Sequence, residues 1–505
     1  MKNIVLVLVM LFPAIWIWGN VPENASVQDG VNVPQSINAP DAVNVPESVS
    51  AQDGAGKAAL NTCSDEVFLR RTYLVLTGRL PKAEKAEQFL TSVKHDKRAQ
   101  LIDSLLDSEE YVRYMVMRWG DILRIKSEFP SNLWPNGVQA YNRWVYEQIN
   151  TNVPYTEFVR RLLLSSGSNF RSPAVNFYRA FLKKTPENIY QNINVLFLGN
   201  RNCKDEGAAC FEQLKYKPTK EWKEEIIYID TEYKARKRSV KLADNTQLPL
   251  SEGEDWRTAY VDWLTHPSNQ QFAAVMTNRL WYWVFGKGIV NEPDDWGAHN
   301  PPSDKALLDK LTKQFIASGY DTKTLLKLIL NSEQYQYGGS FTAQRLPAEV
   351  LVDALADVTG ISDEYRSRVP EPFTYYPAGT RSVDLGDATV SSSALELFGR
   401  VSRDVSLESQ RNSTLTARQL LYLMNSRELE ERIRKSPVLN ELSKQHPNIP
   451  ALCRAITLMT LSRFPTQQEI DIYREYAKTN KLSLRNLASD ILWTQINSIE
   501  FLYNH

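Results

Sequence analysis

Apolar residues recur at helical spacing through most of this chain, and this periodicity constrains the fold more than any other feature. Three widely separated examples are Leu101, Leu105 and Leu106; Phe158, Leu162 and Leu163; and Leu325, Leu326, Ile329 and Leu330. Residues three and four apart lie on one face of a helix. We therefore predict a mainly α protein from Asp65 onward. At 505 residues, the chain exceeds what one ordinary core accommodates, so we expect more than one module.

One stretch breaks the helical pattern. Residues 226–229, 239–242 and 247–250 are rich in β-formers, and the Asp244-Asn245 turn separates the last two. Such runs around a turn predict one or two small hairpins. We therefore expect a multi-helical protein of two modules with a small β-hairpin insertion between them: an N-terminal helical domain (61–215), the insertion (216–255) and a C-terminal helical partner domain (256–505).

The N-terminus has the pattern of an export signal. Lys2 is followed by an apolar run from Ile4 to Trp18, which is the length of a signal-peptide core and short for a membrane span. We expect a signal peptide or an anchor in residues 1–19 and a disordered linker in residues 20–60, which are repetitive and nearly free of aromatic residues. The protein should be exported and should be periplasmic, on the cell surface or extracellular. If the leader is uncleaved, it contacts the membrane.

The two ends of the folded part resemble each other. Arg70, Leu74, Arg79 and Pro81 return at identical spacing as Arg454, Leu458, Arg463 and Pro465. In both sets a helix stops at Arg-x-Pro, where the fixed φ of proline suits the start of the next helix. The ends should therefore be related modules.

Four helix ends are followed by a serine that should cap the next helix. These serines are Ser108, Ser332, Ser426 and Ser498. A serine oxygen at this place accepts the first free N–H groups, and a nearby glutamate complements the positive helix end. These motifs are therefore interpreted as structural.

The strongest candidate site is a proline-bounded loop after the glycines that end a tryptophan-rich helix. Its candidate residues are Asp294, Asp295, His299, Asp304, Arg279 and Trp296. The carboxylates and imidazole could bind a divalent cation, or one aspartate could act as a base beside a sugar stacked on Trp296. The alternative is structural: Asp294 or Asp295 pairs with Arg279, and the tryptophans belong to the core. No spacing here is specific to one metal.

Several functional classes lack support. Lys plus Arg equals Asp plus Glu at 59 each, which argues against a nucleic-acid binder that relies on a net basic field. The sequence contains no Gly-x-Ser-x-Gly elbow, P-loop or dinucleotide fingerprint. The catalytic residues of any enzymatic activity stay unknown.

Cys203 and Cys210 follow an apolar run in a position where a redox cofactor could be tethered. Covalent c-type haem requires two thiols two residues apart and then a histidine, but here six residues intervene and Phe211 follows. We therefore expect no haem. Because cysteines of exported proteins tend to pair, we predict a Cys203–Cys210 disulfide. A bridge between Cys63 and Cys453, which lie beside the two related end helices, is a second hypothesis.

The chain resembles the large secreted proteins described from planctomycetes as cytochrome-associated, which pair two domains of unknown function. The opening of the first domain is matched by Phe68-Leu69-Arg70-Arg71-x-Tyr73-Leu74-x-Leu76-Thr77-Gly78-Arg79-Leu80-Pro81. The second is matched by Asn278-Arg279-x-Trp281, Phe285-Gly286-x-Gly288-Ile289-Val290, Asp294-Asp295, Asn300-Pro301-Pro302-Ser303, Phe398-Gly399-Arg400, Arg403-Asp404 and Asn497-Ser498-x-Glu500-Phe501-Leu502-x-Asn504-His505.

This chain departs from the family pattern where relatives carry histidines. Relatives typically continue after Phe-Leu-Gly with Cys-x-x-Cys-His, and their Asn-Pro-Pro-Ser is followed by His, where this chain has Asp304. We therefore expect a haem-free binding or assembly component of the cell envelope, with an envelope protein or polysaccharide as partner and no nucleic acid. The alternative is a metal-assisted hydrolase or other enzyme that acts on extracellular polymers through Asp294, Asp295 and His299. Electron transfer ranks last.

Overall fold

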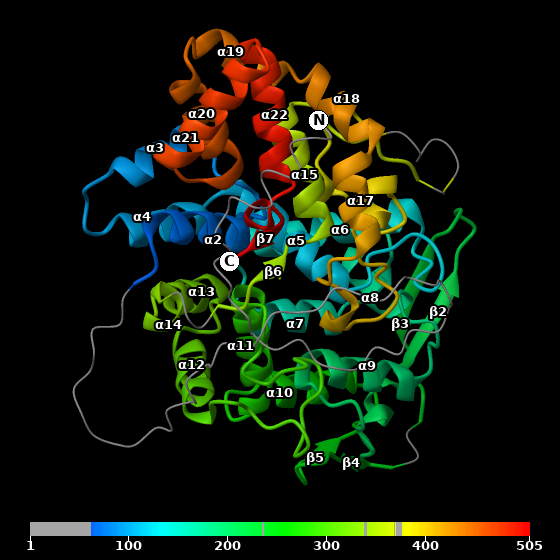
Figure 1. Cartoon of the computed structure of the whole chain (residues 1–505). Helices are drawn as coiled ribbons and strands as arrows, with labels where there is room; N and C mark the ends of the chain where they lie inside the picture. The colour runs from blue at the N-terminus through cyan, green and yellow to red at the C-terminus, as the bar shows by residue number, and fades with distance from the viewer. Residues whose placement is uncertain (1–61, 235–236, 338–340, 368, 370–375) are drawn as a thin grey trace, which may run out of the picture. The chain divides into compact units, whose positions relative to one another are not determined.

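A computed structural model describes residues 62–505 except 235–236, 338–340, 368 and 370–375 (Figure 1). The expected leader (1–19) and linker (20–60) lie outside the described residues, so both stay predictions. Within the described part, none of the helices is long and apolar enough to cross a membrane. Residues from Asn61 to His505 form one compact unit.

The N-terminal half is helical, as the periodicity predicts. Helix α2 (Asp65–Thr77) begins at Ser64, whose side chain accepts a hydrogen bond from Val67 N, and it ends at Gly78 in the left-handed conformation. The helices that follow are α3 (Ala83–Thr91), α4 (Lys97–Leu106), α5 (Glu109–Ile122), α6 (Trp134–Asn150), α7 (Tyr155–Leu163), α8 (Asn176–Arg179) and α9 (Pro186–Leu198), with short 3₁₀ turns η1 (Pro173–Val175) and η2 (Gly207–Phe211).

Small sheets lie between the two helical halves, where strands were predicted. Strand β3 (Glu225–Ile229) pairs antiparallel with β2 (Leu214–Pro218) and with β1 (Gly167–Ser168), so the order is β1-β3-β2. Strands β4 (Ser239–Lys241) and β5 (Gln247–Pro249) form a hairpin in which Val240 opposes Leu248. Both of these side chains are buried. Strand β1 is too short to leave a period-2 signal in the sequence.

Helices dominate the C-terminal half as well. They are α10 (Arg257–Thr265), α11 (Gln270–Phe285), α12 (Lys305–Ala317), α13 (Thr322–Leu330), α14 (Glu333–Gln336), α15 (Ala348–Thr359), α16 (Ser393–Leu397), α17 (Ala417–Asn425), α18 (Arg427–Lys435), α19 (Pro437–Gln445), α20 (Ile449–Leu461), α21 (Gln467–Thr479), α22 (Leu484–Ile496) and α23 (Ile499–Leu502), with 3₁₀ turns η4 (Ser382–Asp384) and η5 (Glu408–Gln410). Strand β6 (Gln344–Arg345) pairs with β7 (Tyr503–Asn504). The prediction of a mainly α fold with small sheets between the modules is confirmed.

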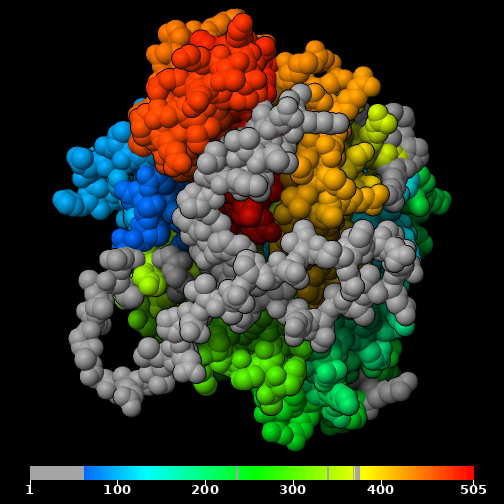
Figure 2. All heavy atoms as spheres, viewed as in Figure 1, coloured from blue at the N-terminus to red at the C-terminus, as the bar shows by residue number. Residues whose placement is uncertain are grey.

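The two ends of the folded unit pack against each other. Arg70 of α2 is buried and donates to the carbonyl oxygens of Thr460 at 3.0 Å and Phe501 at 2.8 Å. In Figures 1 and 2 the red C-terminal helices accordingly lie beside the blue α2–α4 region. Helices α2 and α20 also end alike, with Gly78 and Ser462 both in the left-handed conformation. The repeated Arg-x-Pro motif thus marks two helices of similar design that share one core.

All four predicted serine caps are present. Ser108 accepts from Tyr111 N, Ser332 from Tyr335 N, Ser426 from Leu429 N and Ser498 from Phe501 N. Each serine satisfies one of the N–H groups that a helix start leaves without an intrahelical partner. Their structural interpretation is confirmed.

Candidate functional site

Asp294, the first carboxylate of the candidate loop, is turned into the core. Its side chain is 1% exposed, and Oδ1 accepts from Arg279 Nη2 at 2.8 Å. Oδ2 accepts from the backbone N–H of Glu408 at 2.6 Å. Because an ion pair and a hydrogen bond occupy both oxygens, Asp294 cannot also bind a solvent-borne cation without breaking a buried pair. The structural alternative, in which one of the two aspartates pairs with Arg279, is therefore confirmed for Asp294.

Asp295 and His299 lie at the surface of the same loop. His299 Nε2 lies 3.2 Å from Asp295 Oδ1, and the His299 side chain is 63% exposed. Arg201 Nη1 approaches Asp295 Oδ2 at 3.8 Å, and Arg201 Nε donates to the backbone oxygen of Asp294 at 3.1 Å. Adjacent aspartates therefore point apart, one inward and one outward. The exposed cluster carries a cation, a carboxylate and an imidazole.

Trp296 and Asp304 have structural contacts. Trp296 Nε1 donates to Pro293 O at 2.8 Å, and its backbone N–H donates to Gly199 O at 2.9 Å. A Cβ on Gly199 would lie 2.2 Å from Trp296 Cδ1, so the indole ring packs directly on that turn. Asp304 is the N-cap of α12 and accepts from Leu307 N at 2.9 Å. The structure therefore does not bring Asp294, Asp295, His299 and Asp304 together around one point.

The 293–299 loop nevertheless meets the segment that leads to the first cysteine of interest. The contacts of Trp296 with Gly199 and of Arg201 with Asp294 and Asp295 hold the two segments together. Gln191 of α9 fixes the other side of this segment by donating to Asn200 O and Arg201 O. Two regions about a hundred residues apart in the sequence thus form one junction.

A polar pocket of about 390 Å³ adjoins this junction at the start of α9. Its lining residues come from the first turns of α9, the following loop and η2; they are Thr185, Glu187, Asn188, Tyr190, Gln191, Cys203, Asp205 and Ala208. Ligand sites of small molecules usually enclose about 300–1,000 Å³. The volume of this pocket therefore falls in the range of a ligand site.

Asp205 organises the floor of the pocket. One carboxylate oxygen accepts from Tyr190 Oη at 2.6 Å and Gly207 N at 3.0 Å. The other accepts from Ala243 N at 3.0 Å and from the Cys203 thiol at 3.3 Å. A Cβ on Gly207 would lie 2.4 Å from Tyr190 Cζ, so this glycine permits the close approach of the tyrosine ring. The thiol, phenol and carboxylate are therefore held in a fixed arrangement.

The predicted Cys203–Cys210 disulfide is wrong in this structure, because all four cysteines are free thiols. Cys203 is half-buried, and its sulfur faces the Tyr190 hydroxyl at 3.6 Å and Asp205. Cys210 lies in η2, where its side chain is fully buried in the core. The 3₁₀ turn thus directs one thiol into the core and leaves the other at the pocket. The hypothesis of a Cys63–Cys453 bridge is wrong for the same reason, since neither residue is paired and Cys453 is buried in α20.

The pocket thiol is held in its neutral form. Burial raises the pKa of Cys203, and the negative charge of Asp205 raises it further, although the hydrogen bond between Cys203 and the Tyr190 hydroxyl opposes this. Burial also raises the pKa of Tyr190, with Tyr260 and Asp205 adding to the effect. Because the thiolate is the nucleophile and the metal ligand, Cys203 is suited to donate a hydrogen bond rather than to attack a substrate. Among the described residues, no group of three or more His, Cys, Asp and Glu side chains could hold a metal ion.

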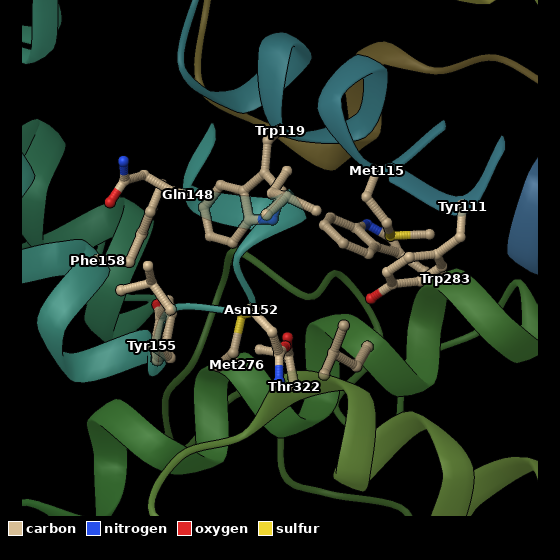
Figure 3. A pocket seen from close by; sticks show the side chains of 13 residues that line it. Tyr111, Met115, Trp119, Gln148, Asn152, Tyr155, Phe158, Met276, Trp283 and Thr322 are labelled. Atoms are coloured by element: carbon tan, nitrogen blue, oxygen red, sulfur yellow. The ribbon is translucent and has the colours of Figure 1, made fainter. Parts of the chain in front are cut away.

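A second cavity, shown in Figure 3, lies among aromatic side chains in the interior. Trp119, Phe158, Tyr155, Met276 and Trp283 point into it from α5, α7 and α11. Its volume is about 30 Å³, which is the space of one water molecule. The Tyr155 hydroxyl is buried without a hydrogen-bond partner, and a single water would satisfy it. This cavity therefore belongs to the core.

The polar pocket was missed by the sequence reasoning. The sequence feature that could have indicated this pocket is the polar start of α9, where Glu187, Asn188 and Gln191 precede a strongly apolar end of the same helix. Sequence reasoning singled out Cys203 but did not connect it with these residues. The loop after α9 brings them together by turning back at Gly199, whose φ is 64°.

The fold and these contacts define a helical protein in which loops from its two halves meet beside a polar pocket. Residues 49–222 match PSCyt2, a protein of unknown function (DUF1549), and residues 256–477 match PSD1, a protein of unknown function (DUF1553). The chain belongs to the family that pairs these two planctomycete cytochrome-associated domains. No curated protein matches the chain. No solved structure matches it either.

The residues at the junction do not fit a covalent c-type haem, the group that the Cys-x-x-Cys-His sequence of relatives implies. Burial raises the pKa of Cys210 to about 12, and its side chain is fully buried, so this thiol is inaccessible for attachment. The pocket lining contains no histidine, and His299, the histidine of the neighbouring loop, faces solvent beside Asp295. Among the described residues, the cysteine and histidine side chains at the junction are therefore not arranged to hold a covalent haem.

Proposed function

We propose that this protein is a haem-free binding component of the cell envelope, which takes a polysaccharide segment into the polar pocket at the start of α9. The observation that carries the proposal is the pocket lining, in which hydroxyl, amide and carboxylate groups surround a volume of about 390 Å³. Sugars are recognised by such groups because each sugar hydroxyl is both a donor and an acceptor. The export part of the proposal rests on residues 1–19, and the envelope location follows from it.

Three side chains at the opening of the polar pocket would contact the polysaccharide directly. Glu187, Asn188 and Gln191 come from the first two turns of α9. Below them, Tyr190, Cys203 and Asp205 form the hydrogen-bonded floor. A rigid floor with polar groups around it lowers the entropy lost on binding. The Cys203 thiol is neutral and donates to Asp205, which favours binding over catalysis.

The alternative of a metal-assisted hydrolase has weaker support. It requires Asp294, Asp295 and His299 to act together, but Asp294 is bound to Arg279 and Glu408 in the core. Electron transfer has the weakest support, because the cysteine and histidine positions do not fit haem.

Binding of envelope polysaccharides to the purified protein tests the proposal. We expect the double variant Glu187→Ala, Asn188→Ala to lose at least about tenfold in affinity, because removing hydrogen-bond partners from a built polar site costs a factor of this order or more. The matched control is Glu147→Ala, Asn150→Ala, which removes an exposed pair from α6. Equal binding by both double variants, or no binding of any envelope glycan by the parent protein, would contradict the proposal. An absorption spectrum with a covalent haem Soret band would contradict its haem-free part.

A further inference from the structure

A third pocket lies where the two family domains meet, and its charged lining residues are all arginines. It has a volume of about 80 Å³, and its lining includes Tyr114, Arg118, Tyr282, Arg345, Arg411 and Asn504. We call it the arginine pocket. The residues come from α5 of the first domain and from α11, β6, β7 and the loop after η5 of the second. No carboxylate lies among the described residues that line it.

Arg345 makes no direct ion pair with a carboxylate of the described residues. Its side chain is 3% exposed, and its Nη atoms donate only to carbonyl oxygens: those of Leu346 at 3.0 Å and of Phe398 and Asn412 at 2.8 Å. Its Nε is buried without any hydrogen-bond partner. No ion pair joins Arg345 to a carboxylate among the described residues. A buried guanidinium with a free N–H calls for an anionic acceptor.

The two other arginines are held by acids that lie behind them. Arg118 Nη2 lies 3.7 Å from Glu408 Oε2. Arg411 binds Asp121 at 2.7 Å and Glu349 at 3.0 Å. These pairs neutralise Arg118 and Arg411 and fix their direction, whereas Arg345 has no direct ion pair and is stabilised only at longer range by Glu349, which already binds Arg411. The pocket is therefore positive and preorganised.

The remaining polar groups narrow the ligand chemistry. Asn504 Oδ1 is buried and accepts no hydrogen bond. A hydroxyl group on the ligand could donate one to it. Asn412 and Ser413 are exposed at the opening, so a solute can enter. A volume of about 80 Å³ suits a solute of few heavy atoms, since one water occupies about 30 Å³.

We propose that the arginine pocket binds a small oxyanion that carries a hydroxyl group, either hydrogen phosphate or a short hydroxycarboxylate. The oxyanion accepts from Arg345 Nε, and the hydroxyl donates to Asn504. Because its walls come from both domains, the bound anion also holds the domains together. This site is separate from the polar pocket at α9, so either proposal can fail without the other.

The test is calorimetric titration of the whole protein at pH 7 with sodium phosphate and with glycolate. We expect saturable binding of at least one of them, weakened at least tenfold in Arg345→Gln and unchanged in the control Arg79→Gln. Arg79 pairs with Asp357 at 3.0 Å outside the pocket. Binding of phosphate alone or of glycolate alone identifies the source of the oxyanion, and either supports the proposal.

Two outcomes overturn it. One is that neither anion binds the parent protein, which would mean that water fills the pocket. The other is that Arg345→Gln binds as the parent does. If Arg345→Gln does not fold, the exposed opening gives a second pair of variants: Ser413→Glu should weaken anion binding several-fold, and Ser413→Lys should not weaken it. Equal affinities of these two would also overturn the proposal.

Discussion

Arg403 and Asp121 form a buried ion pair that joins the two domains across 282 residues of sequence. Arg403 Nε lies 3.0 Å from Asp121 Oδ1, and the two side chains are 2% and 9% exposed. Arg403 also donates to the carbonyl oxygens of Ile125 at 3.1 Å and Gly386 at 2.6 Å. A guanidinium that is bound in this way connects α5 with the loop before η5. The two family domains therefore share one polar core and are expected to unfold together.

Replacing Arg403 should destabilise the protein strongly. Arg403→Ala leaves the Asp121 carboxylate short of one buried partner, and removing one member of a buried pair costs about 3–5 kcal/mol. Arg113→Ala is the matched control, since Arg113 joins α5 to Asp384 at 2.8 Å but is 43% exposed; its cost should be about 0–1 kcal/mol. Chemical denaturation measures both. Equal losses of unfolding free energy in the two variants would show that the buried ion pair stabilises the protein no more than the exposed one.

Acid should remove part of the stability through Glu349. Burial alone raises the pKa of Glu349, but Arg411 and Arg400 outweigh it and lower the pKa to about 2 from 4.5. A depressed pKa gives stability that is present above pH 4.5 and is lost as the pH falls toward 2, about 3 kcal/mol in total. The difference in unfolding free energy between the parent and Glu349→Gln should therefore shrink over this range. A difference that is constant between pH 5 and pH 2.5 would refute this.

All four thiols should be countable, and the two buried ones should be slow to react. Protein unfolded without reductant should give four thiols per chain, because the structure has no disulfide. In the folded protein at pH 7, Cys210 and Cys453 should react only as fast as the chain opens, since burial raises the pKa of each to about 12. Ellman's reagent measures both properties, with Cys210→Ser assigning the slow phase. A count of two would restore the disulfide.

Adding one methyl group at Gly199 should break the junction beside the polar pocket. Gly199→Ala puts Cβ 2.2 Å from Trp296 Cδ1 at a φ of 64°. Gly319→Ala has a similar φ of 72° but nothing within 4 Å, so it isolates the backbone cost of about 1–2 kcal/mol. We expect Gly199→Ala to cost about 1–3 kcal/mol more, because of overpacking. Thermal unfolding compares the two variants. Equal melting temperatures would mean that the Trp296 side chain moves away from the added methyl group without a cost in stability.

Local features were predictable, and long-range ones were only partly so. The serine caps at Ser108, Ser332, Ser426 and Ser498 follow from residues three positions apart, so the sequence alone suffices. The pair of Arg279 and Asp294 was one of two open alternatives, because adjacent aspartates have opposite directions and only the packing selects which one is buried. The disulfide failed because spacing along the chain does not reveal where the η2 turn sends Cys210.

The sequence by itself determined the helical periodicity, the caps, the strands between the modules and the family. These depend on backbone propensity and on contacts within a few residues, which the order of amino acids specifies directly. Only the tertiary structure decided that Glu187, Asn188 and Asp205 line one pocket, and that Arg118, Arg345 and Arg411 surround another. The arginines converge from segments hundreds of residues apart, and their directions depend on how buried charges in both domains are satisfied.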